Sequence, residues 1–80
     1  MEDLEALRGL VNLRELDLSE ASKVKDIQPL AGLQNLQTLR LRRCAVSDIQ
    51  PLSGLHNLEH LDLSNTEVSD LEALRGLVRL

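Results

Sequence analysis

Aliphatic residues recur along this chain at two different spacings. Pairs of leucines two residues apart occur three times, as Leu16 with Leu18, Leu39 with Leu41, and Leu61 with Leu63. A spacing of two places both side chains on the same face of a β-strand. The pattern therefore predicts three short strands, near residues 14–18, 37–41 and 59–63.

Between these pairs the apolar residues fall at every third position. Ile27, Leu30, Leu33 and Leu36 form the clearest run. Side chains three residues apart stack on a 3-10 turn, whereas an α-helix would mix spacings of three and four. Such segments begin at Leu4, Ile27, Ile49 and Leu71. The last three follow Asp26, Asp48 and Asp70, which can accept hydrogen bonds from exposed backbone amides.

Together the two patterns form a repeat of 22 residues. Residues 26–33, DIQPLAGL, return as residues 48–55, DIQPLSGL, and Pro29 and Pro51 fit early in a turn. We place the repeats at 4–26, 27–48 and 49–70, with a partial repeat at 71–80; the first carries one extra residue between Leu18 and Val24. Residues 3–13 also return as residues 70–80, with Arg79 in place of Asn12.

Residues 61–77, LDLSNTEVSDLEALRGL, resemble leucine-rich repeat proteins, in particular the 22-residue class of internalins and of a protein phosphatase regulatory subunit. The resemblance extends over essentially the whole chain. It implies an α/β solenoid arc with three parallel strands on the concave side, short 3-10 segments on the convex side, and a protein partner on the concave face. A leucine-rich helical bundle is disfavoured, because Pro29, Gly32, Pro51 and Gly54 would interrupt any long helix.

One position departs from the family pattern. The position after the strand usually holds an Asn or Cys that ties the loop to the backbone, and here it holds Ala21, Cys44 and Thr66. Ala21 has no polar side-chain atom, so we expect the first loop to be the loosest. Cys44 is expected to be a buried structural thiol rather than a nucleophile, because neither histidine is placed to activate it.

The concave face is the candidate binding surface. Its predicted residues are Glu15, Asp17, Ser19, Thr38, Arg40, Arg42, Arg43, His60, Asp62 and Ser64. Parallel strands lie about 4.8 Å apart, so Arg40 is expected between Asp17 and Asp62, and Thr38 between Glu15 and His60. The surface would have a basic centre and acidic edges. The alternative is a charge ladder that satisfies only itself, each exposed pair contributing less than about 1 kcal/mol.

Residues 56–60, HNLEH, match the H-x-x-E-H motif of zinc peptidases. That chemistry needs both histidines on one face of a helix. The repeat instead predicts His56 at the end of a convex segment and His60 on the sheet. We therefore predict no metal site, no cofactor and no enzyme activity.

The composition narrows the class of partner. Nine basic and 13 acidic residues give a net charge of −4, which argues against nucleic acid. The sequence shows neither a signal peptide nor an apolar run long enough for a bilayer, so we expect one soluble domain over 1–80. The compartment stays open; the single cysteine slightly favours the cytoplasm.

The sequence contains no segment that we identify as a cap, and this suggests a second kind of contact. The leucines expected at the two edges are Leu4, Leu7, Leu10, Leu13, Leu71, Leu74, Leu77 and Leu80. Apolar edges of a solenoid tend to associate, so a homo-oligomer is expected. The favoured function is a protein-interaction module that uses the concave face. The alternative is an excised, consensus-like or designed repeat block that associates through its ends.

Overall fold

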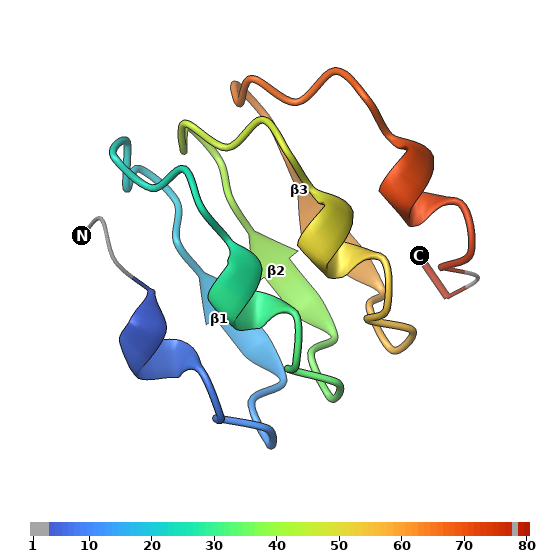
Figure 1. Cartoon of the computed structure of the whole chain (residues 1–80). Coiled ribbons are helices and arrows are strands. Elements are labelled where there is room, and N and C mark those ends of the chain that lie inside the picture. Colours follow the sequence, from blue (N-terminus) through green and yellow to red (C-terminus); the bar gives the residue numbers. More distant parts are fainter. Residues whose placement is uncertain (1–3, 78) are drawn as a thin grey trace.

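Strands and 3-10 turns alternate along the whole solenoid, as the repeat pattern predicts. The computed structural model describes residues 4–77, 79 and 80, so Asp3 and Val78 of the duplicated segments lie outside the described residues. The elements are η1 (Glu5–Leu7), β1 (Glu15–Asp17), η2 (Gln28–Leu30), β2 (Thr38–Arg40), η3 (Gln50–Leu52), β3 (His60–Asp62) and η4 (Glu72–Leu74) (Figure 1).

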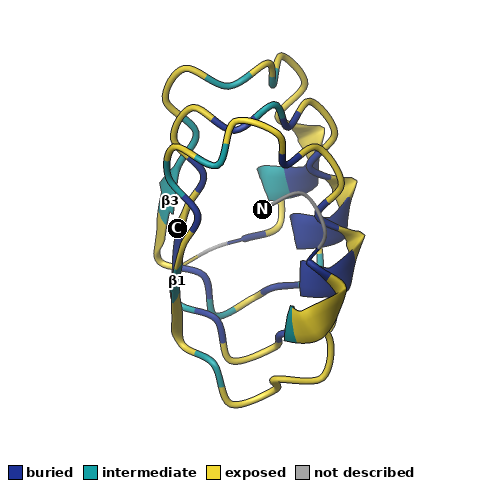
Figure 2. Ribbon diagram, turned by 90° about the vertical axis from the view of Figure 1, so that its left-hand side faces the viewer, coloured by how far each residue is buried: buried dark blue, intermediate teal, exposed yellow. Residues whose placement is uncertain are grey.

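The three strands form one open parallel sheet in the order β1-β2-β3. Leu16 pairs with Leu39, and Leu39 pairs with Leu61, so each repeat advances the sheet by one strand without a shift in register. The sheet lies on one side of the molecule and the 3-10 turns on the other (Figure 2). The predicted fold class is confirmed, although each strand is shorter than expected because it holds three residues.

Aspartates begin three of the four turn segments, as predicted. The Oδ1 atom of Asp26 accepts the amide of Gln28 at 2.9 Å, and Asp48 accepts the amide of Gln50 at the same distance. Asp70 holds the amide of Glu72 at 3.0 Å. These bonds satisfy amides that have no partner within so short a turn. The convex side is therefore built by the same local device in successive repeats.

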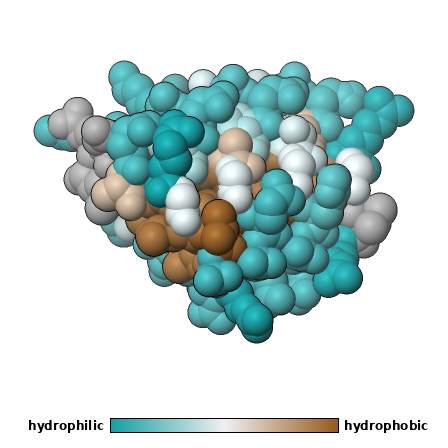
Figure 3. Space-filling view, turned by 60° about the horizontal axis from the view of Figure 1, so that its bottom comes forward, coloured by the Kyte–Doolittle hydropathy of each residue, from teal (hydrophilic) through white to brown (hydrophobic). Residues whose placement is uncertain are grey.

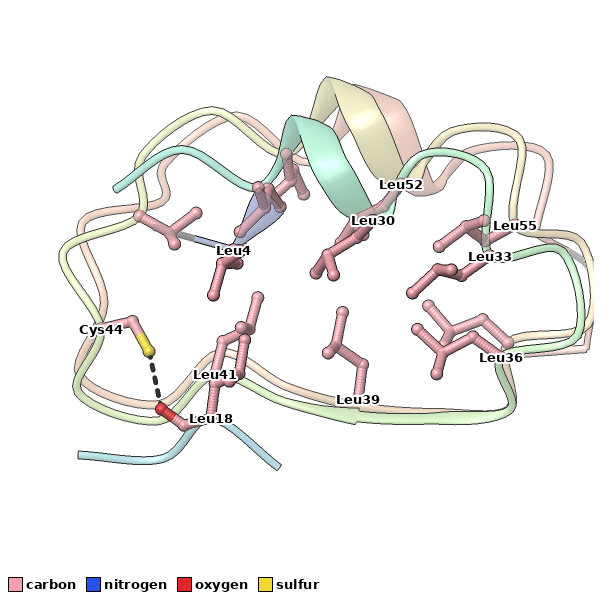
Figure 4. Close-up of a cluster of buried hydrophobic side chains, with 14 of the residues drawn as sticks. Leu4, Leu18, Leu30, Leu33, Leu36, Leu39, Leu41, Cys44, Leu52 and Leu55 are labelled. Atoms are coloured by element: carbon pink, nitrogen blue, oxygen red, sulfur yellow. Dashed lines mark hydrogen bonds between the residues drawn. The ribbon is translucent and has the colours of Figure 1, made fainter. Parts of the chain in front are cut away.

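The core is a stack of leucines between the sheet and the turns. Its central members have no exposed surface; they are Leu30, Leu33, Leu36, Leu39, Leu41, Leu52, Leu55 and Leu58. Figure 4 shows side chains from both sides of the coil meeting in the interior. A chain without aromatic residues thus fills its interior with one aliphatic side chain used at the same positions in each repeat.

The edge leucines differ in exposure. Leu10, Leu71 and Leu80 are 47%, 57% and 45% exposed, as expected of open edges. Leu4 and Leu77 are 2% and 4% exposed, so the expectation of exposed side chains is wrong at these two positions. Leu4 begins the first turn segment, whereas Leu77 lies near the end of the last one. The two segments therefore bury opposite halves of their shared sequence. The remaining edge leucines are partly buried and pack against the core, namely Leu7, Leu13 and Leu74.

The duplicated segments also turn differently. Arg8 has an extended backbone (φ −61°, ψ 127°) and Gly9 has φ +93°, which together make a type II turn. Arg75, the equivalent of Arg8, is in the right-handed helical region (φ −58°, ψ −37°), like Ala31 and Ser53 after η2 and η3. The same local sequence therefore adopts two turn types, which only glycine allows at low cost.

Backbone bonds close the first loop despite the missing side-chain tie at Ala21. The amide of Ala21 donates to the Leu18 carbonyl at 3.1 Å, and the amide of Val24 donates to the Ala21 carbonyl at 2.9 Å.

No helix within residues 4–77, 79 and 80 is long and apolar enough to cross a membrane.

Candidate functional site

Two rows of side chains cross the sheet on its concave face, the side turned away from the leucine core. Glu15, Thr38 and His60 are register partners and form the first row. Asp17, Arg40 and Asp62 form the second. The predicted placement of Arg40 between two aspartates is therefore confirmed. We call these six residues the concave ladder.

Five members of the ladder have accessible side chains. Glu15, Asp17, Arg40 and His60 are exposed, and Asp62 is partly buried. Thr38 was predicted on the concave face between Glu15 and His60, and the register confirms this place, but its side chain is only 9% exposed in the central strand. The face that a partner could reach is therefore its charged outer part, with Thr38 in the floor.

Each aspartate of the ladder has a local partner. Asp17 Oδ1 accepts the amide of Ser19 at 2.9 Å, and Asp62 Oδ1 accepts the amide of Ser64 at 2.9 Å. Bonds from the serine side chain and backbone lower the pKa of both aspartates, and the positive charge of Arg40 lowers it further. Both aspartates thus stay ionised at neutral pH, and each also fixes the turn that follows its strand.

Arg40 makes no ion pair within 4.0 Å in the described part of the chain, and neither does Arg42. Arg42 and Arg43 lie in the turn after β2 rather than on the strand, so the predicted basic centre extends from the sheet into this turn. Arg43 alone of the three meets a carboxylate, with Nη1 3.6 Å from Glu20 Oε1. Both of those side chains are more than half exposed.

The turn after each strand contains a residue in the left-handed region. Glu20, Arg43 and Asn65 occupy equivalent positions with φ of 71°, 65° and 58°. Asparagine tolerates this conformation well, whereas other non-glycine side chains pay roughly 1–2 kcal/mol. Glu20 and Arg43 are therefore held in a backbone geometry that their own side chains do not favour. The sequence pattern gave no sign of this strain.

A shallow hollow of about 340 Å³ lies beside β3. Its lining includes Arg40, His60, Asp62 and Leu80. It joins the end of the concave ladder to the open edge of the sheet. A guanidinium, a carboxylate, an imidazole and an exposed leucine can here contact a polypeptide side chain, but they do not assemble a nucleophile with a base.

The two groups considered for catalysis or metal binding have other surroundings. Cys44 is buried, and its thiol donates to the Leu18 carbonyl of the preceding repeat at 3.0 Å (Figure 4). Burial raises the pKa of this thiol, which keeps it neutral, as expected of a structural cysteine. His56 lies in the turn after η3 and His60 in β3, so residues 56–60 do not form the helix that the H-x-x-E-H chemistry needs.

One set of polar residues joins the repeats and was not predicted from the sequence. Asn35 Nδ2 donates to the Val11 carbonyl at 2.8 Å, and Asn57 Nδ2 donates to the Gln34 carbonyl at 2.9 Å. Asn12 occupies the same repeat position in the first segment, and Arg79 occupies it in the last. The recurrence of asparagine at one position was the available signal. We call this series the asparagine ladder.

Comparison with known proteins identifies the repeat. A family model described as Leucine Rich repeats (2 copies) matches residues 34–76. An internalin C2 from Listeria monocytogenes has 37% sequence identity and a TM-score of 0.94, and the match covers 99% of this chain and 34% of that chain. An internalin inlF from the same species has 26% identity and a TM-score of 0.95, covering 99% and 23%. This chain therefore spans about a third of the first structure. No curated protein matches the sequence.

Proposed function

This chain belongs to the leucine-rich repeat family, and from that premise we propose that it is a non-enzymatic module that binds a protein partner with its concave face. The main support is one observation. Arg40 and Arg42 are exposed and make no ion pair within 4.0 Å among the described residues, while the opposite face of the same sheet is closed by leucines. Cationic side chains held on a strand and on the turn that follows it can bind carboxylates of a partner.

Two further features favour binding over a ladder that satisfies only itself. Glu20 and Arg43 keep the left-handed conformation although asparagine serves at the equivalent position 65. Strain of this kind gathers where a side chain is needed for a contact. In addition, the acidic, basic, acidic order along the second row of the ladder favours a partner with the complementary order, namely a carboxylate flanked by basic side chains.

A selection with random peptides tests this proposal. A displayed library is panned on the 80-residue chain, and enriched peptides are measured against two double variants. Arg40→Gln with Arg42→Gln removes the two unpaired positive charges of the concave face and keeps side chains of similar polarity. Gln28→Ala with Gln50→Ala alters the convex face and serves as the matched control, since both glutamines are exposed at the start of their turns.

We expect the enriched peptides to carry an acidic residue, to lose binding at least tenfold to the concave variant, and to keep binding to the convex variant. The proposal is wrong if the peptides bind the concave variant as well as the parent chain. Peptides that lose binding only to the convex variant would instead place the binding site on the 3-10 turns.

A second candidate function is association between copies of this chain. The observation that favours it is the exposure of large apolar side chains on both ends, with Leu10 and Val11 at one and Leu71 and Leu80 at the other. Figure 3 shows a hydrophobic patch where the first segment comes forward. A measurement of mass in solution across a dilution series tests this candidate.

A further inference from the structure

We propose that residues 4–13 of a second copy can take the place of residues 71–77, 79 and 80 beside η3, so that β1 of the second copy pairs with the open edge of β3. This deepens the second candidate function above and rests on it. We call residues 4–13 the N-terminal segment and residues 71–77, 79 and 80 the C-terminal segment.

The two segments are chemically interchangeable. Residues 3–13 and 70–80 are identical at ten of eleven positions. Both form a three-residue 3-10 turn from the sequence EAL, and the C-terminal segment packs against η3 as η3 packs against η2. The site beside η3 therefore already accepts this sequence, and a copy of it from a second chain meets the same neighbours.

The two segments bury opposite halves of the same sequence. In the N-terminal segment Leu4 is 2% exposed and Leu10 is 47% exposed. In the C-terminal segment the order is reversed, since Leu71 is 57% and Leu77 is 4% exposed. If the N-terminal segment of a second copy lay beside η3, its Leu10 would be buried as Leu77 is buried now. Its Leu4 would stay buried against the second repeat of its own chain. Exchange thus buries both halves of the N-terminal segment, while the displaced C-terminal segment exposes Ala73 and Leu77. The net gain must therefore come from the contacts that the chain's own segment does not make.

The single difference between the segments lies in the asparagine ladder. Asn35 and Asn57 each donate to a carbonyl of the preceding repeat, those of Val11 and Gln34. At the next step the equivalent carbonyl is that of His56. The C-terminal segment presents Arg79 there, whereas the N-terminal segment of a second copy presents Asn12. Exchange therefore extends the ladder by one hydrogen bond that the chain's own segment does not offer.

The edge of β3 offers the matching backbone groups. Leu18 and Leu41 donate their amides to carbonyls of the next strand, Arg40 and Asp62 respectively, at 2.8 and 2.9 Å. The amide of Leu63 is the third in this series and has no backbone acceptor within the described residues. In the proposed complex the Leu63 amide donates to the backbone carbonyl of Asp17 of the second copy. Leu61 and Leu63, which are partly buried at the edge, would be covered by Leu16 and Leu18 of that copy.

The proposed register has one unfavourable contact. Extending the concave ladder by one strand brings Asp17 of the second copy beside Asp62, and Glu15 beside His60. Two aspartates side by side on neighbouring strands repel each other, and salt screens the repulsion. This contact identifies the register, because removing one of the two charges should strengthen the association.

The contact joins different surfaces of the two copies, so it leaves a free β3 edge on one copy and a free N-terminal segment on the other. Such a head-to-tail contact continues beyond a dimer unless its rotation closes a ring. The mass in solution should therefore rise progressively with concentration.

The test is sedimentation velocity of the 80-residue chain and three single variants from micromolar to millimolar concentration. We expect the parent to grow beyond a dimer. Arg79→Asn gives the chain's own segment the ladder donor, and Asn12→Arg removes that donor from the second copy; each should raise the concentration of half-association about three- to tenfold. Asp62→Asn keeps the oxygen that accepts the Ser64 amide and should lower that concentration in low-salt buffer.

Amide hydrogen exchange gives the second readout, with protection of the Leu63 amide expected only at associating concentrations. The proposal is overturned if the chain is a monomer at every concentration. It is also overturned if neither Arg79→Asn nor Asn12→Arg changes the concentration of half-association. Arg79→Asn should stay folded, because it adds a donor to a segment already in place. A chain that stays monomeric but still binds panned peptides on its concave face refutes the exchange alone and leaves the principal proposed function standing.

Discussion

Leu39 shows how one residue position determines the packing of this fold. It has no exposed surface and lies in the central strand, with Leu16 and Leu61 as its register partners. Its neighbours are fixed from three repeats at once, so the interior cannot easily collapse around a smaller side chain.

We expect Leu39→Ala to lower the free energy of unfolding by about 2–5 kcal/mol, which is a large fraction of the stability typical of a small domain. Chemical denaturation followed by circular dichroism measures this. Leu61→Ala, at the partly buried edge of the sheet, is the matched control and should cost less. Equal losses would contradict the assignment of Leu39 to the centre of the core.

The aspartates of the concave ladder make stability depend on acid. Asp17 and Asp62 have a lowered pKa in the folded chain, so their contribution is complete above the pKa of an unfolded aspartate and is lost as the pH falls through the folded value. We expect the melting temperature to fall below about pH 4. The double variant Asp17→Asn with Asp62→Asn keeps the acceptor oxygens and should show a flatter profile there. Parallel profiles would mean that these two groups do not carry the effect.

Substitution of Arg40 tests how the charges of the concave ladder affect stability. Arg40→Glu would place three negative residues side by side in the second row of the ladder, so we expect a lower melting temperature. The pairs are exposed, and each contributes about 1 kcal/mol or less. The loss should shrink in high salt. Arg40→Gln is the neutral control, and a loss that is equal in both variants and both buffers would point to packing rather than charge.

At this scale the sequence predicted which residues face the core, but not how far each is covered. The inward leucines and Asp26 follow from spacing alone. Thr38, Leu4 and Leu77 do not, because their burial depends on side chains of neighbouring repeats that a local pattern leaves out. The two turn types at Gly9 and Gly76 are a further case, since nearly identical segments differ only in what packs against them.

Among the elements, the asparagine ladder joins one repeat to the next on the side between turns and strands. Asn57→Ala removes the bond to the Gln34 carbonyl and should lower the free energy of unfolding by about 0.5–1.5 kcal/mol. Asn12→Ala is the matched control, because the Asn12 side chain donates to no acceptor in the described monomer. Denaturation at low concentration compares the two, and equal losses would show that the bond itself contributes nothing.

The strands and turns were predictable as elements because two and three are distinct spacings in sequence. Their bounds were less so, because the chain leaves each strand through a left-handed residue, at Glu20, Arg43 and Asn65, and only the last of these is a residue type that signals the conformation. Arg42 and Arg43 consequently lie in a turn rather than on the strand.

The whole molecule is a short stack in which each repeat contacts only its neighbours. The repeat made the order and direction of the strands predictable, and with them the alternation of charge across the concave ladder. The partner of the proposed binding face was not predictable, because the face consists of exposed side chains that packing does not constrain. The complementary burial of the two duplicated segments also required the three-dimensional arrangement.

The most direct test of the central claim is a map of the bound surface. Backbone amide signals of the parent chain are followed by nuclear magnetic resonance while a peptide from the panning selection is added at a protein concentration below association. We predict that the largest shifts fall on residues 15–19, 38–43 and 60–64, which form the concave face and the turns beside it. Shifts confined to Gln28–Leu30 and Gln50–Leu52, on the opposite side of the molecule, would contradict the account.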